Sequence, residues 1–111
     1  MAEITYHGVP EPYWHTLDAS EPYVPADFER DGFIHCTDGR EAIASVLTQY
    51  YGDDPGDWLV LTIDKERITA PVKYEDAARI FPHVYGPLNR DAIVDVRQIG
   101  RATDGTFLLP G

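Results

Sequence analysis

Three histidines lie in short apolar segments, and their side chains have the most versatile chemistry in this sequence. His7 lies in "YHG", His35 in "GFIHCT" and His83 in "IFPHVYGPLN". An imidazole ring can donate, accept or exchange a proton near neutral pH, which suits it to acid–base catalysis and to ligand binding. The three rings form one site if their segments converge in the fold. Otherwise each ring is held in the structure by local hydrogen bonds.

The segment "IFPHVYGPLN" contains two prolines and a glycine among apolar residues. Proline breaks a helix and is confined to edge strands of a sheet, so Pro82 and Pro87 predict a shaped loop rather than regular structure. Gly86 permits a conformation, or a close approach, that is closed to other residues. The loop would therefore present His83 and Tyr85 rigidly, which lowers the entropy lost on binding.

A carboxylate and a second aromatic ring come just before this loop, at Glu75 and Tyr74. Both end a predicted strand, which brings them within reach of His83. We therefore expect three catalytic residues, namely His35, His83 and Glu75. The expected ligand-binding residues are His7, Tyr74, Tyr85 and Asn89.

The sequence lacks the residue spacings of several familiar sites. No two histidines are four residues apart, and no Cys or His pairs show the close spacings of a structural zinc site, so no metal site is expected. The G-x-S-x-G elbow of hydrolases and the glycine-rich phosphate loop are also missing. Side chains alternate along "FIHCT", so His35 and Cys36 face opposite sides of the strand. We expect Cys36 to be buried and unreactive.

Composition indicates one folded domain over residues 1–111, with 43% hydrophobic and 25% charged residues. The formal net charge of −10 repels phosphates, so nucleic-acid binding over a broad surface is disfavoured. A single cysteine rules out an internal disulfide. No apolar run approaches the roughly 20 residues of a membrane span, and the N-terminus does not resemble a signal peptide. We therefore expect a cytoplasmic protein that does not contact membranes.

About six short strands account for most of the periodic segments. The run "WLVLTID" is apolar at successive positions, which predicts a central strand covered on both faces. Asp104 and Gly105 favour a hairpin turn before the last strand. The expected strands are, in chain order, residues 4–7, 33–37, 58–64, 72–75, 92–102 and 106–110.

The clearest helix runs from Asp38 to about Tyr51. Asp38 and Glu41 form a capping-box pattern at its start, and Gly52 follows its end. An apolar stripe at helical spacing predicts that this helix packs on a sheet. The stripe consists of Ile43, Val46, Leu47, Tyr50 and Tyr51. With a short helix expected over about residues 12–19, the elements predict an α+β fold with one main and one short helix.

These motifs resemble those of the uncharacterised bacterial family catalogued as domain of unknown function 952. The resemblance rests on "YHG", "GFIHCT", the "WLVLTID" strand, "YE" and "FPHVYGPLN" in that order. It covers nearly the whole chain, from residue 4 to about residue 96. It implies a compact split sheet similar to that of ADP-ribosyltransferases and RNA 2′-phosphotransferases, which hold NAD or a related nucleotide in a cleft.

The resemblance also implies a role for His7 and makes NAD a candidate cofactor. "YHG" is similar to the first-strand motif of transferases, whose histidine hydrogen-bonds the NAD ribose. The paired tyrosines and the late-strand glutamate of those enzymes have no clear counterparts here. Tyr85 and Glu75 are candidates for those roles only because they have the same side-chain types. The phosphate-clamping arginines of the phosphotransferases are not matched either, since the arginines here are scattered.

Two classes of function stay open at this point. In the first, the histidines and Tyr85 line a cleft that binds NAD or another nucleotide-like or phosphorylated small molecule, with a transferase reaction if the protein is an enzyme. In the second, the chain is a non-catalytic binding or protein-interaction module in which the histidines are structural. The sequence does not set the oligomeric state.

Overall fold

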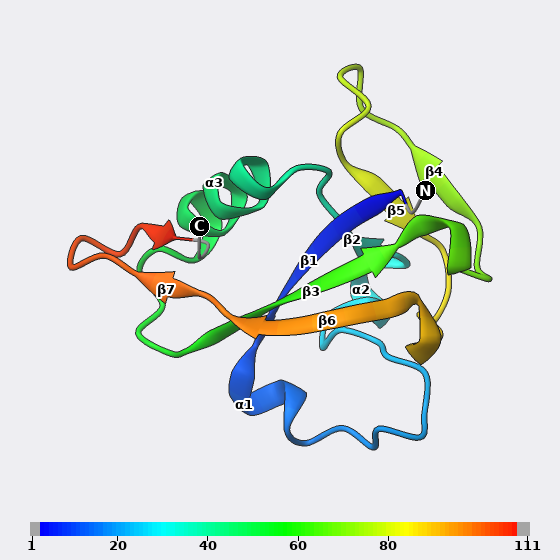
Figure 1. Ribbon diagram of the computed structural model, residues 1–111, viewed down its shortest axis with the longest axis horizontal. Helices are drawn as coiled ribbons and strands as arrows, with labels where there is room; N and C mark the ends of the chain where they lie inside the picture. Colours follow the sequence, from blue (N-terminus) through cyan, green and yellow to red (C-terminus); the bar gives the residue numbers. More distant parts are fainter. Residues whose placement is uncertain (1–2, 109–111) are drawn as a thin grey trace.

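The computed structural model describes residues 3–108 and contains three antiparallel sheets (Figure 1). The first has the strand order β1-β3-β6, with bounds Ile4–Pro10, Trp58–Asp64 and Ile93–Gln98. The second has the order β2-β5-β4, with bounds Ile34–His35, Pro82–Val84 and Val72–Tyr74. A small hairpin pairs β7 (Gly100–Arg101) with β8 (Phe107–Leu108). The predicted α+β class is confirmed.

The described residues also form three α-helices and two 3₁₀ turns. The helices are α1 (Glu11–Trp14), α2 (Phe28–Asp31) and α3 (Arg40–Tyr51). The 3₁₀ turns are η1 (Lys65–Arg67), directly after β3, and η2 (Arg90–Ala92), directly before β6. Within residues 3–108, no helix has the length and apolar character needed to cross a membrane.

The central strand of the first sheet is β3, as its apolar run predicts, and both of its faces are buried. Leu61 and Ile63 belong to a cluster between the first and second sheets, whereas Trp58 and Val60 belong to a cluster under α3. Because a strand alternates its side chains, only a strand covered on both faces is buried at successive positions.

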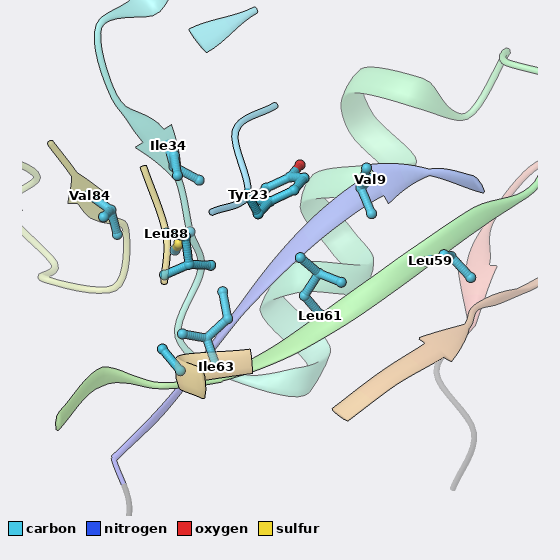
Figure 2. Close-up of a cluster of buried hydrophobic side chains, with 10 residues drawn as sticks. Val9, Tyr23, Ile34, Leu59, Leu61, Ile63, Val84 and Leu88 are labelled. Atoms are coloured by element: carbon cyan, nitrogen blue, oxygen red, sulfur yellow. The ribbon is translucent and has the colours of Figure 1, made fainter. Parts of the chain in front are cut away.

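The larger cluster fills the space between the two main sheets. Ile34 and Val84 of the second sheet turn toward the same cluster as Leu61 of the first (Figure 2). Tyr23 and Leu88 complete it from two loops, which are joined by backbone hydrogen bonds of 2.8 and 2.9 Å. These five side chains are shielded from solvent. Their burial is the main force that holds the second sheet on the first.

Helix α3 covers the opposite face of the first sheet and buries Ile43 and Leu47 (Figure 1). Gly8 of β1 allows the close approach, because a Cβ there would lie 2.5 Å from Cδ2 of Leu47. The predicted apolar stripe is therefore buried at Ile43 and Leu47. Its last two residues are exposed, with Tyr50 69% accessible to solvent and Tyr51 41%.

The predicted capping box of α3 is wrong. Gly39 is the N-cap residue, and no side chain caps the helix. The Asp38 carboxylate instead accepts hydrogen bonds from Lys65 Nζ at 3.2 Å and from Tyr74 Oη at 2.6 Å. Asp38 therefore joins η1 to β4 instead of capping the helix. Gly52 is the C-cap residue, as predicted.

A single isolated bridge among the described residues joins the two main sheets, between β1 and the residues after β2. Tyr6 and Thr37 exchange backbone hydrogen bonds of 2.9 and 2.8 Å. Beyond that bridge β2 pairs with β5, through Ile34 with Val84 and His35 with His83. The backbones of β1 and β2 are therefore paired at one point, and side chains must fill the space where they separate.

The segment "IFPHVYGPLN" contains a strand, so the prediction of an irregular loop is wrong for its first half. β5 begins at Pro82 and is the central strand of the second sheet. Proline is tolerated at the first position of a strand, and its carbonyl still accepts a hydrogen bond from the Cys36 N–H at 3.1 Å. Gly86 allows a close approach, because a Cβ there would lie 3.0 Å from the Cβ of Ala70.

Two predicted elements are shorter than expected. The strand expected over residues 92–102 is interrupted, because its start is the 3₁₀ turn η2 and its end, β7, pairs in a different sheet. The helix expected over residues 12–19 shrinks to α1, and the Thr16 hydroxyl donates to the Tyr13 carbonyl at 2.7 Å just after its end. A hydroxyl that competes for backbone partners favours a turn over a continued helix.

The predicted hairpin at Asp104 and Gly105 is confirmed. Gly105 has φ of 94°, a left-handed conformation that side-chain-bearing residues rarely adopt. β7 and β8 pair on either side of it. Residues 109 and 110 of the expected last strand lie outside the described residues.

The predicted burial of Cys36 is confirmed, since 2% of the residue is exposed, and burial raises the pKa of its thiol to about 12. The thiolate is the reactive form, so we expect a thiol reagent such as DTNB to label the native protein at least tenfold more slowly than the urea-unfolded chain. Following the release of thionitrobenzoate measures both rates. Equal rates would show that Cys36 is accessible in the native state.

Candidate functional site

His35 and His83 lie side by side on the outer face of the second sheet. They are cross-strand partners in the pairing of β2 with β5, and Lys73 is the partner of His83 in the pairing of β4 with β5. Cross-strand partners place their side chains on the same face. Lys73, His83 and His35 therefore form a row across the sheet. The neighbouring Ile34 and Val84 point to the opposite face, into the core.

Aromatic rings lie beside this row. The Phe33 ring stacks on the His83 ring, with centroids 4.1 Å apart and planes inclined by 19°. It also meets the His35 ring edge-on at 4.6 Å and the Tyr85 ring at 5.3 Å. The two imidazole centroids are 5.5 Å apart. We call Phe33, His35, Glu75, His83 and Tyr85 the histidine cluster.

Each imidazole of the cluster is paired with a carboxylate. His35 Nε2 lies 3.2 Å from an oxygen of Asp31, and His83 Nδ1 lies 3.1 Å from Oε1 of Glu75. The Tyr85 hydroxyl donates to the same Glu75 oxygen. This hydroxyl, reinforced by His83, holds the pKa of Glu75 below its usual range. The carboxylate at the centre of this network is therefore ionised at neutral pH.

The cluster leaves one nitrogen of each imidazole available. Within residues 3–108, neither His35 Nδ1 nor His83 Nε2 takes part in a hydrogen bond. The His35 side chain is 61% exposed and that of His83 is 22% exposed. A carboxylate on one nitrogen fixes the ring orientation while the other nitrogen faces a ligand, an arrangement common to histidines that exchange protons.

His7 lies apart from the cluster, in the space between β1 and β2. Its Nδ1 donates to the His35 backbone carbonyl at 2.6 Å, and its Nε2 accepts from the Tyr23 hydroxyl at 2.8 Å. Burial lowers the pKa of His7 to about 4, so the ring is neutral. Because both nitrogens are already bonded inside the protein, the ring has no hydrogen-bonding atom left for a ligand. We therefore interpret His7 as a structural residue rather than as the ribose ligand that its motif implied.

Tyr74, the last residue of β4, lies on the opposite face of that strand from Lys73, because side chains alternate along a strand. Its hydroxyl accepts from Lys65 Nζ at 2.6 Å and donates to Asp38 at 2.6 Å. Burial raises the pKa of the Tyr74 phenol. This group of three polar side chains is separate from the histidine cluster.

Asn89 also lies apart from the cluster and connects η1 to η2. Its side-chain oxygen accepts from the Thr69 N–H at 3.0 Å, and its nitrogen donates to the Arg67 carbonyl at 2.9 Å. The side-chain nitrogen also donates to Asp91 at 2.5 Å. These bonds within the described residues account for the position of Asn89 without a ligand.

The structure thus brings together His35, His83, Glu75 and Tyr85, four of the seven residues predicted for the site. Three neighbours were missed in the sequence. Phe33 lies just before β2, two residues from His35, and Lys73 lies in β4, two residues before Glu75. In extended backbone this spacing favours the same face. Asp31 precedes His35 by four residues, but across the break between α2 and β2, so no helical spacing pointed to it.

A surface hollow of about 540 Å³ lies away from the histidine cluster. It is lined by residues 52–57, which follow α3, and by residues 101–105 of the β7–β8 turn. Arg101 crosses it and donates to the backbone carbonyls of Gly52, Asp54 and Gly56 at 2.7–3.1 Å. None of the predicted site residues lines this hollow.

Residues 8–96 match the model of the family described as Protein of unknown function (DUF952). The chain therefore belongs to that family. The matched region includes the whole histidine cluster. No curated protein matches the sequence.

Solved structures of one protein, CC0527 from Caulobacter crescentus, share the fold. Its X-ray structure has a TM-score of 0.78 at 20% sequence identity and covers 94% of this chain and 92% of that chain. The X-ray structure of a double mutant gives the same values. The solution NMR structure of CC0527 has a TM-score of 0.72 at 21% identity, over 93% of this chain and 90% of that chain. At this identity the likeness shows the fold alone.

Proposed function

We propose that the outer face of the second sheet binds a nucleotide-like or phosphorylated small molecule. The observation that carries the proposal is the row formed by Lys73, His83 and His35, which lies beside the aromatic rings of Phe33 and Tyr85. A phosphate suits the row, because an ammonium group donates hydrogen bonds and an imidazole that is protonated on its second nitrogen donates one as well. A planar base suits the aromatic rings, since stacking on one ring contributes about 1–3 kcal/mol per base.

The charge of the protein favours a small ligand over a nucleic acid. The formal net charge is −10, and Asp31 and Glu75 add negative charge beside the two histidines. A polynucleotide brings many phosphates near that field, whereas a mononucleotide brings one or two that can sit on the row itself. NAD is one candidate of this kind. His7 does not supply the ribose contact of an ADP-ribosyltransferase in this proposal, because its ring is buried in the core.

The second candidate is a non-catalytic module in which the histidines are structural. For His7 this interpretation is favoured, because both of its ring nitrogens bond within the protein. His7 links β1 to the backbone of β2 and is 6% exposed. His35 is different, because its side chain is 61% exposed. A cytoplasmic location remains a prediction from the sequence.

Titration with AMP, NAD and ribose 5-phosphate tests the proposed site. We expect AMP or NAD to raise the melting temperature of the protein by mass action. Phe33→Ala removes the central ring, so it should weaken AMP binding about 5- to 150-fold, the equivalent of about 1–3 kcal/mol. Ribose 5-phosphate has no base, so its binding should change little. Calorimetric titration measures each dissociation constant.

Tyr50→Ala is the matched control, because Tyr50 is an exposed aromatic residue on α3 outside the cluster. It should bind AMP as the wild type does. The proposal is wrong if no nucleotide or sugar phosphate binds the wild type, or if Phe33→Ala and Tyr50→Ala bind AMP equally well.

A further inference from the structure

Two carboxylate–imidazole pairs meet on the proposed binding face, which is more than binding alone requires. Asp31 with His35 comes from one side, and Glu75 with His83 comes from the other. The two rings are edge-to-face at 5.5 Å between centroids. Each ring keeps one nitrogen without a hydrogen-bond partner among the described residues. One proton acceptor and one proton donor can therefore act on the same small group.

We propose that His35 and His83 are a general acid–base pair that hydrolyses the cyclic phosphodiester of a single nucleoside. This inference rests on the proposed function, because the substrate occupies the same face. Phe33 and Tyr85 would hold the base, and Lys73 would face the phosphate from the other side of His83. Asp31 and Glu75 are positioning residues that act through the imidazoles.

The reaction consumes one water molecule. One neutral imidazole takes a proton from water as the water oxygen forms a bond to phosphorus. The bond from phosphorus to one ribose oxygen breaks, and the second imidazole, present as imidazolium, gives its proton to that oxygen. The product is a nucleoside monophosphate with a free hydroxyl, and a proton exchange with solvent restores both rings. No electrons are transferred.

The chemistry of the neighbouring groups favours this reaction over one with a covalent intermediate. The thiol of Cys36 belongs to the core on the other side of the second sheet, and burial raises its pKa to about 12. The Tyr85 hydroxyl donates to Glu75, which raises the pKa of the phenol and makes it a poor nucleophile. We therefore assign the role of nucleophile to water activated by a histidine.

A phosphodiester with a single phosphorus also fits the size of the face. The strands of the second sheet are two or three residues long, so the row of Lys73, His83 and His35 spans the sheet once. A cyclic nucleotide places its one phosphorus near both imidazoles. A longer nucleic acid meets the negative charge of the whole molecule.

Incubation of the protein with adenosine 2′,3′-cyclic phosphate, and in parallel with the 3′,5′-cyclic isomer, tests the inference. We expect the phosphorus NMR spectrum to show conversion of at least one isomer to an adenosine monophosphate. The 2′,3′-cyclic isomer would give the 2′- or 3′-monophosphate, and the 3′,5′-cyclic isomer would give the 3′- or 5′-monophosphate. His35→Gln and His83→Gln should each lower the turnover rate at saturating substrate about 10²–10⁴-fold. His15→Gln should not change it, because His15 forms a similar pair with Glu11 at 3.1 Å but lies outside the face.

Binding of AMP to the same preparations separates this inference from the proposed function. If AMP binds the wild type but neither isomer is hydrolysed, the acid–base pair is refuted and the binding site stands. If AMP does not bind and nothing is hydrolysed, both are refuted. Hydrolysis that persists in His35→Gln or His83→Gln, or falls equally in His15→Gln, also refutes the pair.

Discussion

Acidification from pH 7 to pH 4 should lower the free energy of unfolding by roughly 3 kcal/mol through His7 alone. The pKa of His7 is lowered to about 4 from its usual 6.5, because the buried ring cannot be solvated as an imidazolium. A protonated ring could no longer accept the hydrogen bond from the Tyr23 hydroxyl, whose oxygen lies 2.8 Å from Nε2. The native structure therefore requires the neutral form.

The sign follows from proton uptake. Below pH 6.5 the unfolded chain binds a proton at His7 while the native protein does not, so the unfolded state is favoured as pH falls. The stability contributed by His7 is complete above pH 6.5 and is lost on the way to about pH 4. Carboxylates with lowered pKa, such as Glu75 and Asp76, have the same sign but act mostly below pH 5. The range from pH 6.5 to pH 5 is therefore the informative window.

Urea unfolding at several pH values in that window, on the wild type and on His7→Gln, measures the effect. Glutamine cannot titrate, so the variant should be less stable at pH 7 but should lose much less stability on acidification. His15→Gln, which removes an exposed histidine, should retain the full dependence of the wild type. An NMR titration in which the His7 ring protonates near pH 6.5 in the folded protein would contradict this account.

Ile43→Ala should destabilise the protein by about 2–5 kcal/mol, whereas His83→Ala should cost about 1 kcal/mol. Ile43 is 3% exposed and lies in the cluster under α3, so its truncation leaves a cavity. His83 is at the surface, and its partner Glu75 is 49% exposed and keeps the Tyr85 hydroxyl. Its loss leaves no buried group without a partner.

Ligand binding should show the reverse order. His83→Ala removes the middle of the row and the ring on which Phe33 stacks, so AMP affinity should fall at least tenfold. Ile43→Ala should bind AMP as the wild type does, provided that it is measured below its melting temperature. Urea unfolding curves and calorimetric titrations on both variants provide the two comparisons. If His83→Ala unfolds as readily as Ile43→Ala, the histidine is needed for the architecture.

Local patterns in the sequence were sufficient for several elements. The apolar run at β3 and the spacing of Ile43 and Leu47 on α3 identify segments that must be buried, and Asp104 with Gly105 identifies a turn. Each of these depends on residues that are close in sequence, so periodicity and turn chemistry predict them. The same alternation correctly placed Cys36 in the core and His35 on the exposed side.

The tertiary structure decided which histidines are neighbours. Alternation along β1 places His7 on one face of its strand but cannot say that this face meets Tyr23, which is 16 residues away, and the His35 carbonyl, which is 28 residues away. Pro82 was read as a strand breaker, yet its place at the first position of β5 makes it compatible with a central strand. That strand sets His83 beside His35. The sequence by itself determined the residue types and the buried segments, whereas long-range pairing decided the neighbours, because contacts between distant residues leave no periodic signal in one chain.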